Sequence, residues 1–169
     1  MSTTFFVLLQ ISILAYALVA GVFLAFSDFI TRSLALTGGV GGVEAMQVIN
    51  REVFRWVFMA LFLGMAAVSV LIAGYAWVAL SGPAGTLIGV AALVYLIGCF
   101  GVTVAFNVPM NQALAGMELS SEATRDYWLQ SYVPRWTFWN SVRTGAAALA
   151  AALLLFGLLW MTQSQSQSA

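Results

Sequence analysis

The residues of this chain that are best suited to chemistry are a few polar side chains at the ends of long apolar segments. Asn107 and Asn111 lie four residues apart, and Asn140 and Arg143 lie three apart, so each pair shares one face of a helix. Polar and ionisable groups are costly at the edge of a membrane, and there they mark candidate sites. The full set comprises Asp28, Asn50, Asn107, Asn111, Asn140 and Arg143.

Aromatic residues accompany this set, namely Phe23, Phe26, Trp56, Trp136 and Trp139. If the helix ends that carry them meet, the polar and aromatic groups together form the mouth of a binding site. The simpler interpretation is that tryptophan at this depth belongs to the interfacial belt, and that asparagine caps a helix or bonds across a helix pair. Arg143 directly precedes a charge-free segment, so it is either a snorkelling anchor or a ligand clamp.

Residue types that are absent narrow the chemistry. The chain has no histidine and no lysine, and Cys99 is its only thiol. Without histidine there is no imidazole base, and no haem, copper or two-His-one-carboxylate iron site of the usual kind. Without lysine no Schiff base can form. We therefore expect neither a metal site nor a cofactor.

The elements that must position these residues are membrane-spanning helices. Of 169 residues, 62% are hydrophobic and 7% are charged, whereas soluble domains contain about 25% charged residues. All charges fall within residues 28–55 and 118–143. A span needs about 20 apolar residues, so the charge-free blocks predict four spans, with a Gly- and Pro-containing turn dividing the middle block. The predicted spans are 5–26, 56–80, 86–106 and 144–161.

We therefore predict an all-α integral membrane protein, a four-helix transmembrane bundle in one domain (1–162) with a disordered polar tail at 163–169. Short helical segments are expected in both charged loops. One covers Val43–Arg55, and the other begins after an N-cap at Ser120–Ser121. Pro134 is expected to break this second segment from the last span, and Pro109 could end the third span.

The charge distribution also predicts an orientation. Four spans with a short second loop place both charged segments, and all six arginines, on one side of the membrane. The positive-inside rule makes this side cytoplasmic in a cell membrane and puts both termini on the opposite side. An arginine kept for a binding site would add to this count without being a topology signal. The zero net charge predicts no nucleic-acid partner. The lipid bilayer is the expected partner, and the sequence leaves open whether the chain forms a homo-oligomer.

Four segments of the sequence are similar to the motifs of a known family. They are Gly21–Phe29, Ala45–Arg51, Phe106–Asn111 and Trp136–Thr144. Together and in this order they resemble the anthrone oxygenase-like family of small membrane proteins (DUF1772), and they span nearly the whole chain. The chain departs from the family in one place. Many members carry histidine after the asparagine of the last motif, where this chain has Ser141.

The resemblance implies a cofactor-independent monooxygenase that uses O₂ to oxidise a flat aromatic or hydroquinone-like substrate, such as a tricyclic anthrone. It implies that Trp136 and Trp139 stack on the substrate, and that Asp28 or Glu44 accepts the ring C–H proton. The side chains that would donate hydrogen bonds to the substrate oxygens are Asn50, Asn107, Asn111, Asn140 and Arg143.

A competing interpretation is a membrane protein without enzymatic activity. Such a protein would bind a small hydrophobic or quinone-like ligand, or would support a neighbouring membrane enzyme or transporter. The same aromatic mouth would serve this role. The two interpretations differ in whether a bound aromatic compound is oxidised in the presence of O₂.

Overall fold

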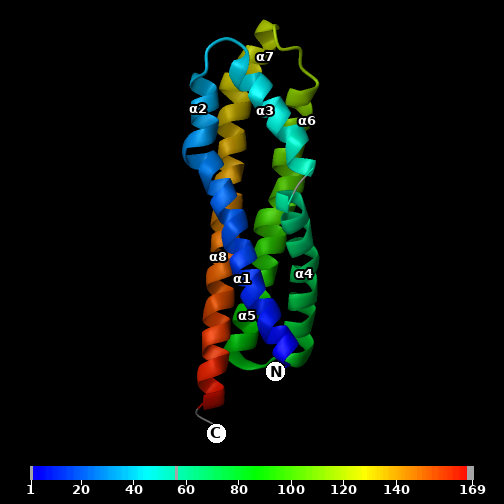
Figure 1. Cartoon of the computed structure of the whole chain (residues 1–169), viewed down its shortest axis with the longest axis vertical. Helices are drawn as coiled ribbons and strands as arrows, with labels where there is room; N and C mark the ends of the chain where they lie inside the picture. Colours follow the sequence, from blue (N-terminus) through cyan, green and yellow to red (C-terminus); the bar gives the residue numbers. More distant parts are fainter. Residues whose placement is uncertain (1, 56, 167–169) are drawn as a thin grey trace.

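The computed structural model describes residues 2–55 and 57–166, and this part of the chain is helical apart from short loops, without strands (Figure 1). Four long helical rods run along one axis. Their length and composition are those of membrane-crossing helices. The predicted all-α four-helix bundle is confirmed, and the chain is a small membrane protein.

Short π-helical turns (η) interrupt three of the rods without ending them. The first rod comprises α1 (Thr3–Ala25), η1 (Phe26–Ile30) and α2 (Thr31–Leu36), and the second is α4 (Val57–Ala79). The third comprises α5 (Gly82–Val94), η3 (Tyr95–Gly101), η4 (Thr103–Asn107) and α6 (Val108–Ala115). The fourth comprises α7 (Glu122–Asp126), η5 (Tyr127–Tyr132) and α8 (Val133–Ser166). In the sequence, α3 (Gly41–Glu52) and the 3₁₀ turn η2 (Val53–Arg55) connect the first rod to the second.

The rods differ in length, and the difference creates two levels in the molecule. The second rod has 23 residues, whereas the first and third have 34 each. At 1.5 Å per residue these are about 35 Å and about 51 Å, against a hydrocarbon core of about 30 Å. Three rods therefore extend beyond the end of α4. Helix α3 lies at this extended end (Figure 1).

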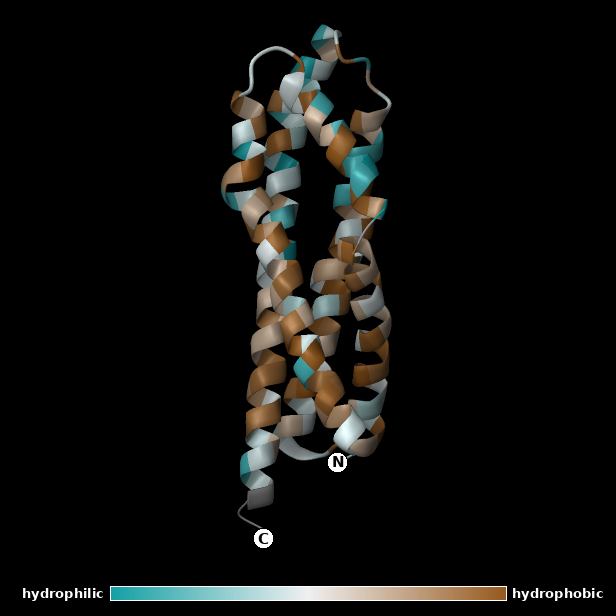
Figure 2. Ribbon diagram, viewed as in Figure 1, coloured by the Kyte–Doolittle hydropathy of each residue, from teal (hydrophilic) through white to brown (hydrophobic). Residues whose placement is uncertain are grey.

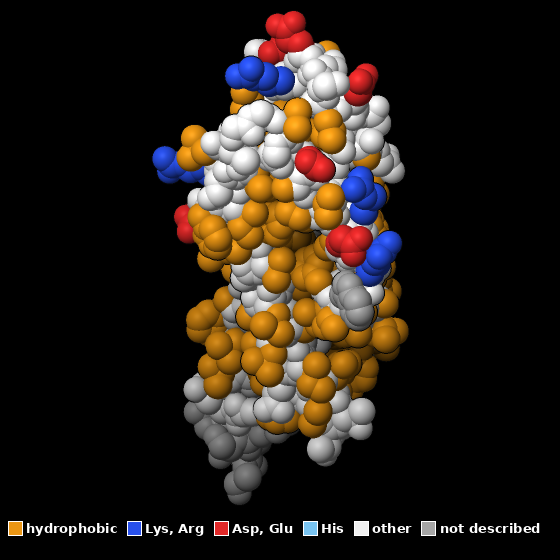
Figure 3. Space-filling view, turned by 45° about the horizontal axis from the view of Figure 1, so that its top comes forward, with side chains coloured by type: hydrophobic (Ala, Val, Ile, Leu, Met, Phe, Trp, Pro, Cys, Tyr) orange, Lys and Arg blue, Asp and Glu red, His pale blue; other side chains and the backbone are white. Residues whose placement is uncertain are grey.

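The extended end carries the charges, and the surface along the rest of the rods is largely apolar. Figure 2 shows hydrophilic residues concentrated at the end formed by α2, α3, α6 and α7, and Figure 3 shows the charged side chains gathered there. Both chain ends lie at the other end of the bundle (Figure 1). Large apolar side chains are exposed along the rods, and Trp77 is 90% exposed. Such a surface is suited to lipid rather than to water.

The two prolines do not end or break their helices, so the predicted break at Pro134 is wrong. A proline lacks an N–H group, and its ring collides with the carbonyl four residues earlier. Here η4 ends at Asn107, two residues before Pro109, and η5 ends at Tyr132, two residues before Pro134. A π-helical turn widens the helix by one residue. The local change of hydrogen-bond register accommodates each ring within a continuous rod.

Other local predictions can be compared with the structure directly. Helix α3 and turn η2 cover the segment expected to be helical in the first charged loop, and α7 begins directly after Ser121. The turn between α4 and α5 uses Gly82 with φ +72°, a conformation that favours glycine. Helix α8 continues to Ser166, the disordered tail at 163–169 stays a prediction, and 167–169 lie outside the described residues.

Two clusters of buried side chains form the core. The larger lies among the four apolar rods and includes Tyr16, Ile72, Tyr95 and Leu154. The smaller lies at the charged end, where α3, α6, η5 and α8 pack together. Its buried members are Val43, Met46, Leu114, Trp128, Tyr132 and Trp136. Of the polar residues predicted from the sequence, Asn50, Asn111 and Arg143 lie beside members of both clusters.

Candidate functional site

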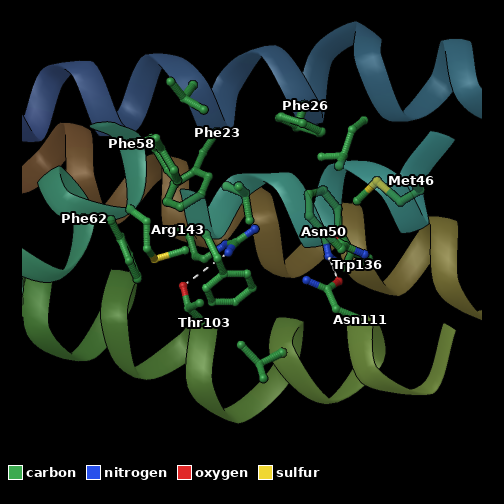
Figure 4. Close-up of a pocket in the computed structure, with 16 residues that line it drawn as sticks. Phe23, Phe26, Met46, Asn50, Phe58, Phe62, Thr103, Asn111, Trp136 and Arg143 are labelled. Carbon is green, nitrogen blue, oxygen red and sulfur yellow. Dashed lines mark hydrogen bonds between the residues drawn. The ribbon is translucent and has the colours of Figure 1, made fainter. Parts of the chain in front are cut away.

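An apolar pocket occupies the boundary between the two clusters (Figure 4). The cavity itself has a volume of about 90 Å³, and the non-atom space reaches about 610 Å³ when the open mouth and the solvent in it are included. Most of its wall is aromatic or aliphatic. The lining residues with polar side chains, apart from the indole of Trp136, are Asn50, Thr103, Asn111 and Arg143.

Arg143 is the charged residue of this pocket, and it is almost completely buried. Its side chain is drawn beside Phe23 and Thr103 in Figure 4, and the residue is 4% exposed. The guanidinium carbon lies 4.1 Å from the centroid of the Phe23 ring and 5.3 Å from that of Trp136. Both contacts are within the range of cation–π attraction. The buried position favours the ligand clamp over a surface anchor.

Two neutral oxygen atoms hold the guanidinium in place. Arg143 Nη2 donates to Asn140 Oδ1 at 2.6 Å, and Nη1 donates to Thr103 Oγ1 at 3.2 Å. The Thr103 hydroxyl itself donates to the carbonyl of Cys99 at 2.8 Å, which turns its lone pairs towards the arginine. Nε of Arg143 is buried without a hydrogen-bond partner. The group therefore retains a donor that the protein does not satisfy.

The positive charge of Arg143 has no counter-ion in the pocket. All six carboxylate residues lie in the described part of the chain and are exposed, and none of them lines the pocket. The ion pair found among the described residues joins Arg55 and Glu52 at the surface. A buried charge that lacks a partner costs several kcal/mol. An anionic ligand group would offset this cost.

Asn140 connects the arginine to the first rod. It is fully buried, and its Nδ2 donates to the Phe23 carbonyl and to Ser27 Oγ, each at 2.6 Å. These two bonds orient the amide so that Oδ1 faces Arg143. Asn140 does not line the pocket itself. The sequence predicted a catalytic role for Asn140, and the structure places it behind Arg143, to which its Oδ1 accepts a hydrogen bond.

A second polar group lies on the wall formed by α3, α6, η5 and α8. Asn111 Oδ1 accepts from the Tyr132 hydroxyl and from Trp136 Nε1, both at 2.8 Å. Asn50 Nδ2 donates to the same hydroxyl at 3.3 Å. These bonds fix the Trp136 ring, which lines the pocket and is 5% exposed. The predicted binding residues Asn50, Asn111 and Trp136 are thus brought together.

The remaining predicted residues lie elsewhere. Asn107 is buried beside the pocket, where Nδ2 donates to the Trp136 carbonyl at 3.2 Å and Oδ1 has no partner. Trp139 stacks on Phe106, with ring centroids 3.6 Å apart, and does not line the pocket. Asp28 and Glu44 are exposed and also do not line it. Trp56 lies outside the described residues.

Sequence analysis missed Tyr132 and Thr103. Tyr132, Trp136 and Asn140 recur every four residues, and this spacing is a signal for one helical face. The expected break at Pro134 hid the pattern, because it placed Tyr132 in a different helix. Ser141, where many relatives carry histidine, is exposed and donates to Ser27 Oγ at 3.0 Å. It does not line the pocket.

A family model described as anthrone oxygenase matches residues 51–153, which is more than half of the chain. The chain belongs to the anthrone oxygenase family. Searches of curated proteins and of solved structures returned no match. The matched range includes Thr103, Asn111, Trp136 and Arg143 of the pocket.

The described part of the chain contains no group of three His, Cys, Asp or Glu side chains that could hold a metal ion. The pocket instead offers two kinds of feature. One is an apolar wall of aromatic and aliphatic side chains, and the other is two sets of polar side chains, with Arg143 in one and Asn50 with Asn111 in the other. This arrangement suits a planar molecule that carries oxygen atoms at its edges.

Proposed function

We propose that this member of the anthrone oxygenase family oxidises a flat aromatic substrate with O₂ in the pocket, and that Arg143 stabilises the substrate as an anion. The observation that carries the proposal is the buried guanidinium beside aromatic rings, with an unsatisfied Nε and no carboxylate lining the pocket among the described residues. Such a site favours a ligand that becomes negatively charged during the reaction.

The attraction between Arg143 and a substrate anion is large enough to change the acidity of the bound substrate. Two opposite unit charges 4 Å apart attract by about 4 kcal/mol at an effective dielectric constant of about 20. An attraction of this size would shift the acidity of a bound C–H or O–H acid by about three pKa units, since one unit corresponds to about 1.4 kcal/mol. The enolate of an anthrone-like ketone would then be accessible near neutral pH.

The reaction needs no electrons from the protein. Deprotonation of a methylene carbon between two aromatic rings gives an electron-rich enolate, and this enolate reduces O₂. One oxygen atom ends as the new ketone, and the other leaves as water with the two hydrogens that the methylene loses. Because no carboxylate lines the pocket, we assign the first proton to water at the pocket mouth rather than to Asp28 or Glu44.

The test uses the purified chain in detergent with an anthrone, with and without O₂. Quinone formation is followed by absorbance and O₂ consumption by an electrode, with an expected ratio of one to one. Arg143→Gln should lower the catalysed rate by about 10²–10³-fold, the usual effect of removing an oxyanion-stabilising donor. Arg135→Gln is the matched control, because Arg135 is exposed on the same helix. The proposal fails if the wild type shows only the uncatalysed rate.

The same purified sample distinguishes the proposed oxygenase from a membrane protein that binds the compound without oxidising it. If a flat aromatic compound binds at the pocket but no O₂ is consumed, the chain is a ligand-binding membrane protein.

We also propose that the charged end is cytoplasmic in the cell membrane. Five exposed arginines remain at that end when Arg143 is assigned to the pocket, namely Arg32, Arg51, Arg55, Arg125 and Arg135.

A further inference from the structure

The way in which the pocket opens to its surroundings indicates where its ligand comes from. Two of the lining side chains are exposed, namely Val22 on α1 and Phe54 on η2. They are 40% and 66% exposed, respectively, and both are apolar. The polar lining residues are buried or half-buried. The pocket mouth is therefore bordered by hydrocarbon rather than by hydrogen-bonding groups.

The mouth lies at a defined height along the bundle, between the apolar rods and the charged end. Val22 lies within the charge-free helix α1, and Phe58, Met59 and Phe62 of the pocket wall belong to the apolar helix α4. Phe54 is followed directly by Arg55, whose surface ion pair with Glu52 marks the charged level. The opening thus lies at the transition from apolar to charged surface. Aromatic compounds with one polar edge concentrate at this level of a bilayer.

We propose that the pocket is filled sideways from the membrane interface, between α1 and the start of α4, with Val22 and Phe54 forming the portal. This inference rests on the proposed function for the substrate class, and it restricts that class to neutral, membrane-partitioned polycyclic aromatics. A charged or strongly water-soluble analogue would have to cross the apolar portal at a desolvation cost. The neutral ketone enters from the lipid, and it is converted to the anion only where it meets Arg143.

A portal residue affects the rates of binding and release more than the affinity. Val22→Phe narrows the opening at the exposed rim of the pocket. It should slow association and dissociation by the same factor, about tenfold for an added barrier of about 1.4 kcal/mol. Phe54→Ala should speed both. The dissociation constant should change much less in both variants than in Arg143→Gln, because Val22 and Phe54 line the pocket only at its exposed rim.

The experiment measures anthraquinone binding to the full chain in lipid nanodiscs by stopped-flow quenching of tryptophan fluorescence. Leu18→Phe is the matched control, because Leu18 lies one turn before Val22, is 63% exposed and does not line the pocket. Anthraquinone monosulfonate, which stays in water, serves as the second probe. We expect it to associate more slowly than anthraquinone, and we expect the anthraquinone rate to follow the concentration of the probe in the bilayer.

Equal rates for wild type, Val22→Phe and Phe54→Ala would overturn the portal, as would faster association of the sulfonate. Absence of anthraquinone binding would overturn it too. The measurement involves no turnover, so its result is independent of the oxygenase assay. If the portal variants change the rates of anthraquinone binding but no quinone forms, lateral access is supported and the proposed reaction is refuted. If quinone forms but the portal variants bind anthraquinone at the wild-type rates, the reaction is supported and the portal is refuted.

Discussion

Asn140→Asp tests most directly whether Arg143 recognises an anion. In the wild type, Asn140 Oδ1 accepts from Arg143 at 2.6 Å and is uncharged. Aspartate has nearly the same shape but places a negative charge at this position. The variant gives the guanidinium an internal counter-ion, so it should remove the attraction of the pocket for an anionic ligand while keeping the size of the side chain.

The expected effect follows from the charge separation. An attraction of about 4 kcal/mol between charges 4 Å apart corresponds to about 10³-fold in affinity, since about 1.4 kcal/mol is tenfold. Partial screening at the open mouth reduces this to about 10²-fold. Aspartate also cannot donate to the Phe23 carbonyl and Ser27 Oγ. Each lost buried bond costs about 1–3 kcal/mol of stability, and the new ion pair offsets part of this loss.

The assay compares two ligands and two variants in detergent, with binding measured by tryptophan fluorescence. One ligand is a hydroxyanthraquinone at a pH where it is anionic, and the other is neutral anthraquinone. Asn140→Ala is the control, because it removes the same hydrogen bonds without adding charge. We expect Asn140→Asp to lose far more affinity for the anion than Asn140→Ala does, and both to lose similar affinity for the neutral ligand. Equal or tighter anion binding by Asn140→Asp would refute the role of Arg143.

Two further predictions concern the packing that holds the pocket, and both are measured by unfolding in detergent. Tyr132→Phe removes the hydroxyl that joins Asn50 to Asn111, so it should lower the free energy of unfolding by about 1–3 kcal/mol. Tyr75→Phe, at an exposed tyrosine, should have no effect, and equal losses in the two variants would contradict the network. Gly98→Ala would place a Cβ 2.6 Å from that of Ala146, so it should cost about 1–3 kcal/mol by forcing the third and fourth rods apart. Gly64→Ala meets no atom within 4 Å and should not destabilise, so a stable Gly98→Ala variant would show that the two rods can separate freely.

The positions of the spans could be predicted because hydrophobicity is a property of each segment by itself. A charge-free block of sufficient length must be helical in lipid, where every backbone group needs a partner within its own segment. The ends of the helices were less predictable. The third and fourth rods continue through Pro109 and Pro134, because π-helical turns absorb the clash with each ring. Such turns depend on packing against neighbouring helices and leave no local composition signal.

The sequence predicted which residue types form the site, but only some of the predicted residues line the pocket. Asn50, Asn111, Trp136 and Arg143 share the pocket as expected. Trp139 follows the same motif, yet its position on α8 directs it to Phe106. A spacing pattern defines which residues share a helical face, but it does not define which face turns towards the other helices. That choice is made by the packing of all four rods.

The sequence by itself determined that this is a helical membrane protein, that its charges gather at one end and that histidine and lysine chemistry is absent. These conclusions follow from composition, which folding does not alter. The tertiary structure decided that Arg143 is buried, that neutral oxygens of Asn140 and Thr103 hold it, and that every carboxylate lies outside the pocket. Whether a charge has a partner depends on distances between helices far apart in the sequence, and only the folded bundle defines these distances.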